Sequence, residues 1–189
     1  MESSTYYTLE DYYMLGEFGE KKYIKWELIK GIFKMSPAPK TNHQKSSAAL
    51  LFEVYGFFKK KKCKVFDSPY DIILGDSVVQ PDICVICDTD KIKEHGCVGI
   101  PDFIIEILSK STEKMDRIDK FNLYEEFGLK EYWIVDPLKE SNITLTQFVS
   151  EDNILTRKQQ YTKSDKIRSY IFPDLEICLE DILITREGL

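Results

Sequence analysis

Glu106 is the only charged residue in the apolar run FIIEIL at residues 103–108. Alternation along a strand places Ile104, Glu106 and Leu108 on one face. A carboxylate that is buried in this way is costly unless an opposite charge or a metal ion accompanies it. We therefore expect another part of the chain to supply a cation, or the means to hold one, next to Glu106.

A second acid, Asp82, lies in VVQPDICVIC at residues 78–87, which we interpret as the preceding strand. Pro81 cannot donate a ladder hydrogen bond and leaves the strand edge open beside Asp82. Two carboxylates at the ends of neighbouring strands repel each other unless a cation lies between them. Oxygen ligands of this kind suit Mg²⁺ or Mn²⁺, so Asp82 and Glu106 are predicted to hold such an ion.

Lys120 is the third candidate and lies on a helix expected at 112–127. A helical wheel at about 100° per residue places Lys120 in the middle of the apolar arc, together with Asp116 and Arg117. Its amine could extend past the apolar neighbours into solvent, or pair with Asp116 one turn earlier. We favour a contact with Glu106, because the helix directly follows the Glu106 strand. Two acids and a lysine around a divalent metal ion are what phosphodiester hydrolysis requires.

The net charge of −6 at pH 7 argues against a broadly basic surface of the kind that non-specific nucleic-acid binders carry. The lysine run at residues 59–62 is the obvious local basic patch. A simpler interpretation is that these lysines solvate and end a helix. The composition, with 43% hydrophobic and 31% charged residues, is that of an ordinary globular protein.

We expect a cytoplasmic protein that does not bind a membrane. No apolar run has the length of a membrane span, and MESSTYYTLEDYY at the N-terminus lacks the features of a signal peptide. The five cysteines, an odd number scattered through apolar segments, fit reduced thiols. Cys84 and Cys87 form a C-x-x-C pattern, but strand alternation directs them to opposite faces, so core packing is preferred to a zinc or redox role.

The order of elements predicts one α/β or α+β domain over residues 1–189, with a mixed central β-sheet flanked by helices. A parallel βαβ unit is expected to join the Glu106 strand to the next one. Helices are expected at 8–16, 41–62 and 112–127, a charged loop at 88–98, and strands at 24–29, 32–36, 63–66, 70–74, 78–87, 102–109, 130–136, 143–149 and 154–161.

Four segments, QPDICVICD, PDFIIEILSKST, DRIDKFNLYEEFGLKEYWIVDP and WELIKGIFKMSP, resemble the Uma-two family of endonucleases. The resemblance runs from about residue 6 to residue 182 and implies the restriction-endonuclease-like fold of the PD-(D/E)XK superfamily, with a Mg²⁺- or Mn²⁺-dependent site. Asp82 and Glu106 match the two motif acids, and the backbone carbonyl of Ile107 is the expected third metal ligand. Leu108 stands where the superfamily has lysine, and Lys120 matches the lysine that this family carries on the following helix.

Two further positions are implied by the same resemblance. Glu27, in WELIKG, matches an accessory acid, and His43, at the start of the long helix, is another family-like position. The simpler alternatives are a solvated hairpin charge for Glu27 and a helix-capping histidine for His43.

Three functions are compatible with these residues. The first is a metal-dependent DNA endonuclease. The second is a weakly catalytic or inactive module that binds nucleic acid or regulates another protein from a nuclease scaffold, and the third is a hydrolase of another phosphate substrate. A two-fold homodimer would suit double-strand cleavage, and the aromatic residues available for its interface are Tyr6, Tyr7, Tyr12, Tyr13 and Trp26.

Overall fold

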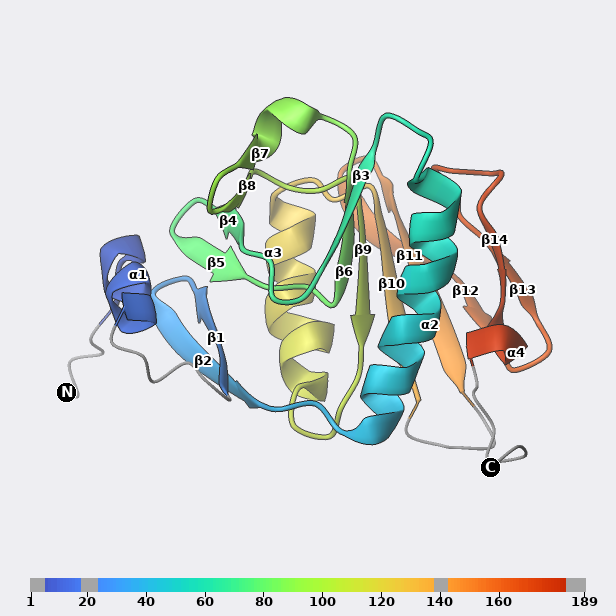
Figure 1. Ribbon diagram of the computed structural model, residues 1–189, viewed down its shortest axis with the longest axis horizontal. Coiled ribbons are helices and arrows are strands. Elements are labelled where there is room, and N and C mark those ends of the chain that lie inside the picture. The colour runs from blue at the N-terminus through green and yellow to red at the C-terminus, as the bar shows by residue number, and fades with distance from the viewer. Residues whose placement is uncertain (1–5, 18–23, 138–142, 183–189) are drawn as a thin grey trace.

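Two six-stranded sheets and one two-stranded sheet make up the strands of this computed structural model, which describes residues 6–17, 24–137 and 143–182 (Figure 1). The first sheet has the order β2 (Ile32–Pro37), β1 (Ile24–Ile29), β5 (Ser77–Val79), β4 (Ile72–Leu74), β8 (Gly96–Val98) and β7 (Ile92–Lys93). The second has the order β12 (Ile154–Tyr161), β11 (Thr144–Glu151), β10 (Glu131–Asp136), β9 (Phe103–Ile107), β6 (Ile83–Ile86) and β3 (Lys64–Asp67). The third pairs β13 (Lys166–Arg168) with β14 (Glu176–Cys178).

The helical elements are α1 (Leu9–Glu17), α2 (Thr41–Phe58), the 3₁₀ turn η2 (Thr89–Lys91), the π-helical segment η3 (Met115–Asp119), α3 (Lys120–Glu126) and α4 (Leu179–Ile182). The mixed α and β architecture, with mixed sheets flanked by helices, confirms the predicted fold class.

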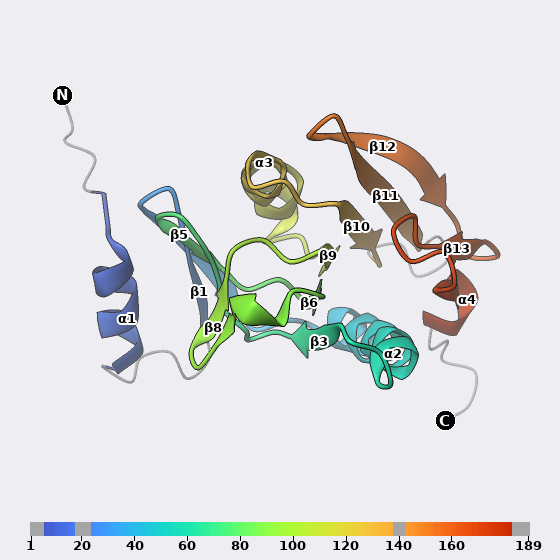
Figure 2. The ribbon, with the colours of Figure 1, turned by 90° about the horizontal axis from the view of Figure 1, so that it is seen from above.

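The second sheet is covered on both faces (Figure 2). One face packs against α2, α4 and the β13–β14 pair, and the other packs against α3 and the first sheet. Every residue of β9 is buried, as the nearly continuous apolar run predicts for a strand with two covered faces. Phe103, Ile105 and Ile107 face α2, so Glu106 faces α3 as alternation requires.

The central strands β6, β9 and β10 position the predicted acids. β9 and β10 are parallel and joined through η3 and α3, which confirms the predicted βαβ unit. β6 runs antiparallel to β9, with Ile83 opposite Ile105. The residue before Ile83 is Asp82, so the start of β6 meets the end of β9 beside Glu106.

The strand predicted at 78–87 is wrong as a single element, because the structure divides it between two sheets. β5 belongs to the first sheet and β6 to the second, with Gln80, Pro81 and Asp82 between them. Pro81 has no backbone N–H for a ladder, which explains the break at this point. The charged loop predicted at 88–98 contains η2 and the short strands β7 and β8, and β13 was not predicted at all.

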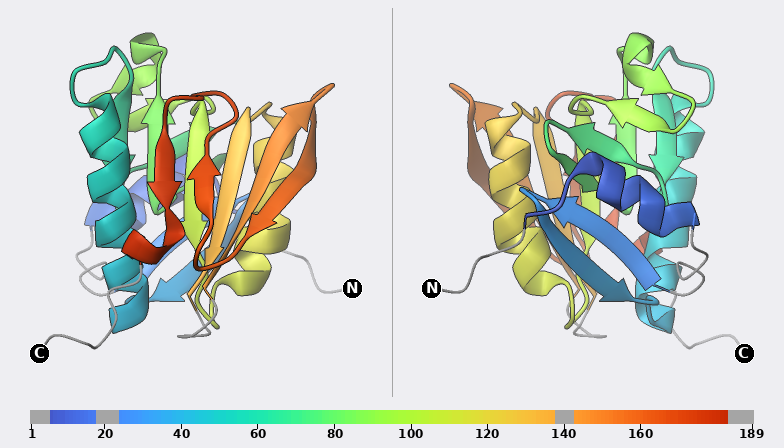
Figure 3. Two further views of the ribbon diagram at one scale, coloured as in Figure 1. Left: turned by 90° about the vertical axis from the view of Figure 1, so that its right-hand side faces the viewer. Right: turned by 90° about the vertical axis from the view of Figure 1, so that its left-hand side faces the viewer.

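The N-terminal helix α1 lies on the outer side of the first sheet, across the β1–β2 hairpin (Figure 3). The Thr8 hydroxyl and the Asp11 carboxylate cap its start, in agreement with the predicted helix start. Tyr12 is fully buried between α1 and the sheet, and Trp26 packs at the edge of the same cluster. The idea that Tyr12 belongs to an exposed aromatic dimer face is therefore wrong, whereas Tyr6, Tyr7 and Tyr13 are exposed.

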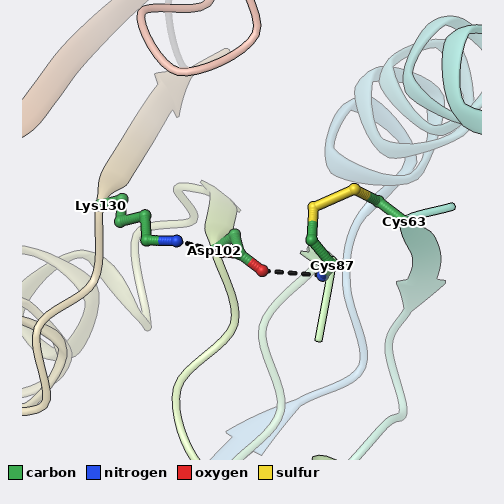
Figure 4. Close-up of a disulfide and its surroundings, with 4 residues drawn as sticks. All are labelled: Cys63, Cys87, Asp102 and Lys130. Atoms are coloured by element: carbon green, nitrogen blue, oxygen red, sulfur yellow. Dashed lines mark hydrogen bonds and ion pairs between the residues drawn. A yellow bond between two sulfur atoms is a disulfide. The ribbon is translucent and has the colours of Figure 1, made fainter. Parts of the chain in front are cut away.

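A disulfide between Cys63 and Cys87 corrects the expectation of five reduced thiols (Figure 4). β3 pairs with β6 so that Lys64 is opposite Ile86, and the next residues outward, Cys63 and Cys87, therefore face each other. Cys84 is a buried core residue, as predicted, and is one of three free cysteines with Cys97 and Cys178.

No helix in the described part of the chain is both long and apolar enough to cross a membrane.

Candidate active site

Lys120 is the centre of a buried cluster of charged side chains. Its ammonium lies 2.9 Å from Oε1 of Glu27, 2.9 Å from Oε1 of Glu106 and 3.3 Å from Oδ1 of Asp116. The Lys120 side chain is 1% exposed, so it does not extend into solvent. The contact of Lys120 with Glu106 and its pairing with Asp116 one turn earlier, which the sequence offered as alternatives, are both present. Although burial opposes ionisation of Lys120, these carboxylates hold its pKa well above the usual range.

The π-helical segment η3 directs Asp116 and Lys120 to the same place. The Lys120 amide donates to the carbonyl of Met115, five residues earlier, so the turn is wider than in an α-helix. The Tyr132 hydroxyl donates to the Asp116 carbonyl at 3.0 Å and fixes this turn against β10. Insertions of this kind are rare and often occur at functional sites.

Glu106 accepts hydrogen bonds from both sides of the cluster. Its Oε1 accepts from the Lys120 ammonium at 2.9 Å and from the Tyr124 hydroxyl at 3.0 Å. Its Oε2 lies 3.4 Å from the backbone N–H of Asp82. Burial raises the pKa of Glu106 to about 8, and the ammonium of Lys120 only partly opposes this shift. The nearby carboxylates of Asp116 and Asp82 raise the pKa of Glu106 further.

Asp82 lies where the cluster approaches solvent. Its Oδ2 accepts from the Ile107 amide at 2.7 Å and lies 3.2 Å from Nε2 of His43, which comes from the first turn of α2. Burial alone would raise the pKa of Asp82, but the His43 hydrogen bond and the charge of Lys25 hold it at about 2. His43 thus contacts a candidate metal ligand rather than serving only as a helix cap.

Glu27 reaches the cluster from the other sheet. Leu28 faces α1, so strand alternation directs Glu27 the opposite way, toward α3. Its Oε1 accepts from the backbone N–H of Gln80 at 2.7 Å as well as from Lys120, and its carboxylate is fully buried. The interpretation of Glu27 as a solvated hairpin charge is therefore wrong. The chain crosses between the sheets at Pro81. Gln80, on one side of Pro81, donates to Glu27, and Asp82 follows on the other side, so this segment brings Glu27 close to Asp82.

The cluster fits a divalent cation by its charge and by its donors. Three carboxyl groups, those of Glu27, Glu106 and Asp116, contact one fully buried ammonium, and the buried carboxyl group of Asp82 lies near Glu106. Oε2 of Glu27 is buried without a hydrogen-bond partner. Among the described residues, no three or more His, Cys, Asp or Glu side chains are arranged as a metal-ligand set. Two carboxylate ligands would be usual for Mg²⁺, because Mg²⁺ retains waters and binds substrate phosphate.

Sequence reasoning identified most of this cluster but missed three members. Sequence reasoning did not identify the Tyr124 hydroxyl, which donates to Glu106, or the backbone N–H of Gln80, which donates to Glu27. Lys25, 3.9 Å from Oε1 of Glu27, follows the same alternation as Glu27 along β1. That alternation was the one available signal, since Lys25 and Glu27 share a face of their strand.

The comparisons with known proteins identify the family and the fold of this chain. The model of the Uma2 family, described as "Putative restriction endonuclease", matches residues 9–180, and this chain belongs to that family. The fold of this chain is similar to that in the crystal structure of a putative nuclease belonging to DUF820 from Anabaena variabilis. The TM-score is 0.73 and the sequence identity is 19%. The match covers 93% of this chain and 97% of that one. No curated protein matches the sequence.

Proposed function

We propose that this protein is a metal-dependent nuclease that hydrolyses phosphodiester bonds in DNA, with Asp82 and Glu106 as ligands of Mg²⁺ or Mn²⁺. The observation that carries this proposal is the meeting of Glu27, Asp82, Glu106 and Lys120, which come from two sheets and a helix, in one buried cluster. Four buried carboxyl groups and one buried ammonium form no stable hydrophobic core, which fits a site that serves chemistry.

Each side chain has a role that follows from its contacts. Asp82 stays ionised near pH 7, since its pKa is held at about 2, and it presents a carboxylate on the solvent side of the cluster. When bound, a divalent cation supplies Lewis acidity and lowers the pKa of water. The carbonyl of Ile107 is the proposed third ligand, and the Ile107 amide already contacts Asp82.

Lys120 and its partners act on charge and position. The Lys120 ammonium balances negative charge that develops on the phosphate in the transition state. Glu27 and Asp116 hold that ammonium in place, and His43 orients the Asp82 carboxylate. We also propose that DNA rather than RNA is the substrate, that the protein is cytoplasmic, and that two copies associate when both strands are cut.

Cleavage of plasmid DNA in the presence of Mg²⁺ or Mn²⁺ tests the proposal. Asp82→Asn is expected to abolish cleavage while the circular dichroism spectrum stays native. Asp90→Asn is the matched control, because Asp90 is exposed on η2, away from the cluster. The Asp90→Asn protein should cleave at the wild-type rate. Wild-type cleavage by the Asp82→Asn protein would remove Asp82 from the site.

One observation favours the second function, a binding or regulatory module. Leu108 occupies the position of the superfamily lysine and is buried in the core, and Lys120 is engaged by three carboxylates. Titration calorimetry separates the two functions. If the protein is a nuclease, the Glu106→Gln substitution should weaken its binding of Mn²⁺. If it is a module without a metal site, the wild-type and Glu106→Gln proteins should give the same Mn²⁺ titration.

A further inference from the structure

A second polar site lies on the same face of the second sheet as Glu106, on the far side of η3. It is a pocket of about 290 Å³ with the side chains of Arg117 and Arg157 in its lining. Thr144 and Thr146 of β11 and Gln160 of β12 contribute further hydrogen-bonding groups. The proposed catalytic cluster uses none of these residues.

A β-bulge builds one wall of this pocket. Thr146 of β11 pairs with Gln160 and Phe148 pairs with Arg157, so two steps on β11 correspond to three on β12. Residues 157 and 160 would point to opposite faces of a regular strand. The extra residue, Lys158, turns Arg157 and Gln160 to the same face, and both line the pocket. Bulges that redirect side chains in this way are over-represented beside functional sites.

Arg117 forms the opposite wall and is held by two carboxylates. Its Nε donates to Oε1 of Glu113 at 2.9 Å, and its terminal nitrogen lies 3.6 Å from Oδ2 of Asp136. Asp136 also lines the pocket, so two guanidinium groups face one carboxylate there. Glu113 and Asp136 both pair with Arg117, whereas Arg157 forms no ion pair with a carboxylate in the described part of the chain, so Arg157 brings positive charge to the pocket in a protein whose net charge is −6.

The strand register gives the position of the pocket relative to the catalytic cluster. Glu106 is opposite Ile134, Ile134 is opposite Thr146, and Thr146 is opposite Gln160. With strands about 4.8 Å apart, Thr146 lies roughly 10 Å from Glu106 along the sheet. Backbone phosphates wind around the duplex, so their direct separation exceeds the axial rise of about 3.4 Å for each nucleotide of one strand, and this distance spans fewer than three nucleotides.

We propose that the pocket between Arg117 and Arg157 binds a backbone phosphate of the DNA strand, fewer than three nucleotides from the bond that is cut. The planar guanidinium groups match the oxygens of a phosphate, and threonine hydroxyls and the glutamine amide donate further hydrogen bonds. The inference rests on the proposed nuclease function and names where the substrate strand is held. It also places DNA contacts on an otherwise acidic protein.

DNA binding by the Arg157→Gln protein tests the pocket, measured by fluorescence anisotropy of a labelled duplex with Ca²⁺ over a range of salt concentrations. Loss of one phosphate contact should weaken binding about tenfold and reduce the slope of log K against log salt by about 0.9. In cleavage assays KM should rise and kcat should stay near the wild-type value. Arg157→Lys should recover part of the affinity, because it keeps the charge but not the fork.

Arg168→Gln is the matched control, since Arg168 is an exposed arginine on β13 that pairs with Glu176 outside the pocket. It should leave the salt slope and KM unchanged. If the wild-type protein cleaves DNA but Arg157→Gln has the wild-type slope and KM, the pocket inference fails and the nuclease proposal stands. A different outcome would overturn both proposals. In it the wild-type protein neither binds nor cleaves DNA, and inorganic phosphate raises the Tm of the wild-type protein but not that of the Arg157→Gln protein. The pocket would then bind free phosphate rather than DNA.

Discussion

Replacement of Lys120 by methionine isolates the electrostatic balance of the cluster. Methionine keeps most of the volume of the side chain but removes the ammonium that contacts Glu27, Glu106 and Asp116. Removal of one partner from a buried ion pair costs about 3–5 kcal/mol, because the other charges stay buried without compensation. For a chain of 189 residues this corresponds to a decrease in Tm of roughly 6–20 °C.

The sign of the pH dependence follows from Glu27. In the wild-type protein burial raises the pKa of Glu27, but the charges of Lys120 and Lys25 and the hydrogen bonds from Gln80 and Lys120 lower it by more. Ionised Glu27 therefore contributes stability above its unfolded pKa of about 4.3. Without the ammonium of Lys120, burial raises the folded pKa of Glu27, and stability is then lost as the pH rises through it. The Lys120→Met protein should therefore be more destabilised at pH 7 than at pH 4.

Thermal unfolding followed by circular dichroism at both pH values measures this effect. Lys130→Met is the control, because Lys130 also pairs with an acid, Asp102 at 2.5 Å, but is 61% exposed. An exposed pair contributes at most about 1 kcal/mol, so the control should lower Tm by roughly 4 °C or less. A Lys120→Met protein that unfolds within about 4 °C of the wild type at pH 7 would refute the electrostatic account of the cluster.

Three further outcomes follow from other parts of the structure. Leu108→Lys should lower the free energy of unfolding by at least about 2 kcal/mol in urea titrations, since Leu108 is a buried core residue. Unchanged stability would show that this position can accommodate the lysine that the superfamily carries there. Glu131→Ala should cost at least about 3 kcal/mol in the same assay, because the Glu131 carboxylate accepts from the Trp133 indole and the Ser169 hydroxyl; a loss below about 1 kcal/mol would contradict this network. Thiol titration of the denatured protein should find three reactive cysteines before reduction and five after it, and five before reduction would exclude the Cys63–Cys87 disulfide.

The sequence by itself indicated which residues form the centre of the buried charged cluster. Glu106 could be recognised because strand alternation is strict, and one carboxylate among apolar neighbours must point into a covered face. Lys120 could be recognised because helical periodicity placed it in an apolar arc, and the structure buries it beside Glu106. Asp82 could be recognised as a second acid next to Pro81, although its position beside Glu106 also depends on the pairing of β6 with β9. Local patterns of this kind depend only on the geometry of one element.

Only the tertiary structure decided what surrounds these residues. Glu27 lies on another sheet, and its contact with Lys120 depends on how the chain crosses at Pro81, which alternation within one strand does not specify. The disulfide between Cys63 and Cys87 depends on the register of β3 against β6. The pocket at Arg157 depends on one extra residue in β12. In each case the deciding contact joins segments that are far apart in the sequence, and packing between elements rather than the periodicity of any one of them brings them together.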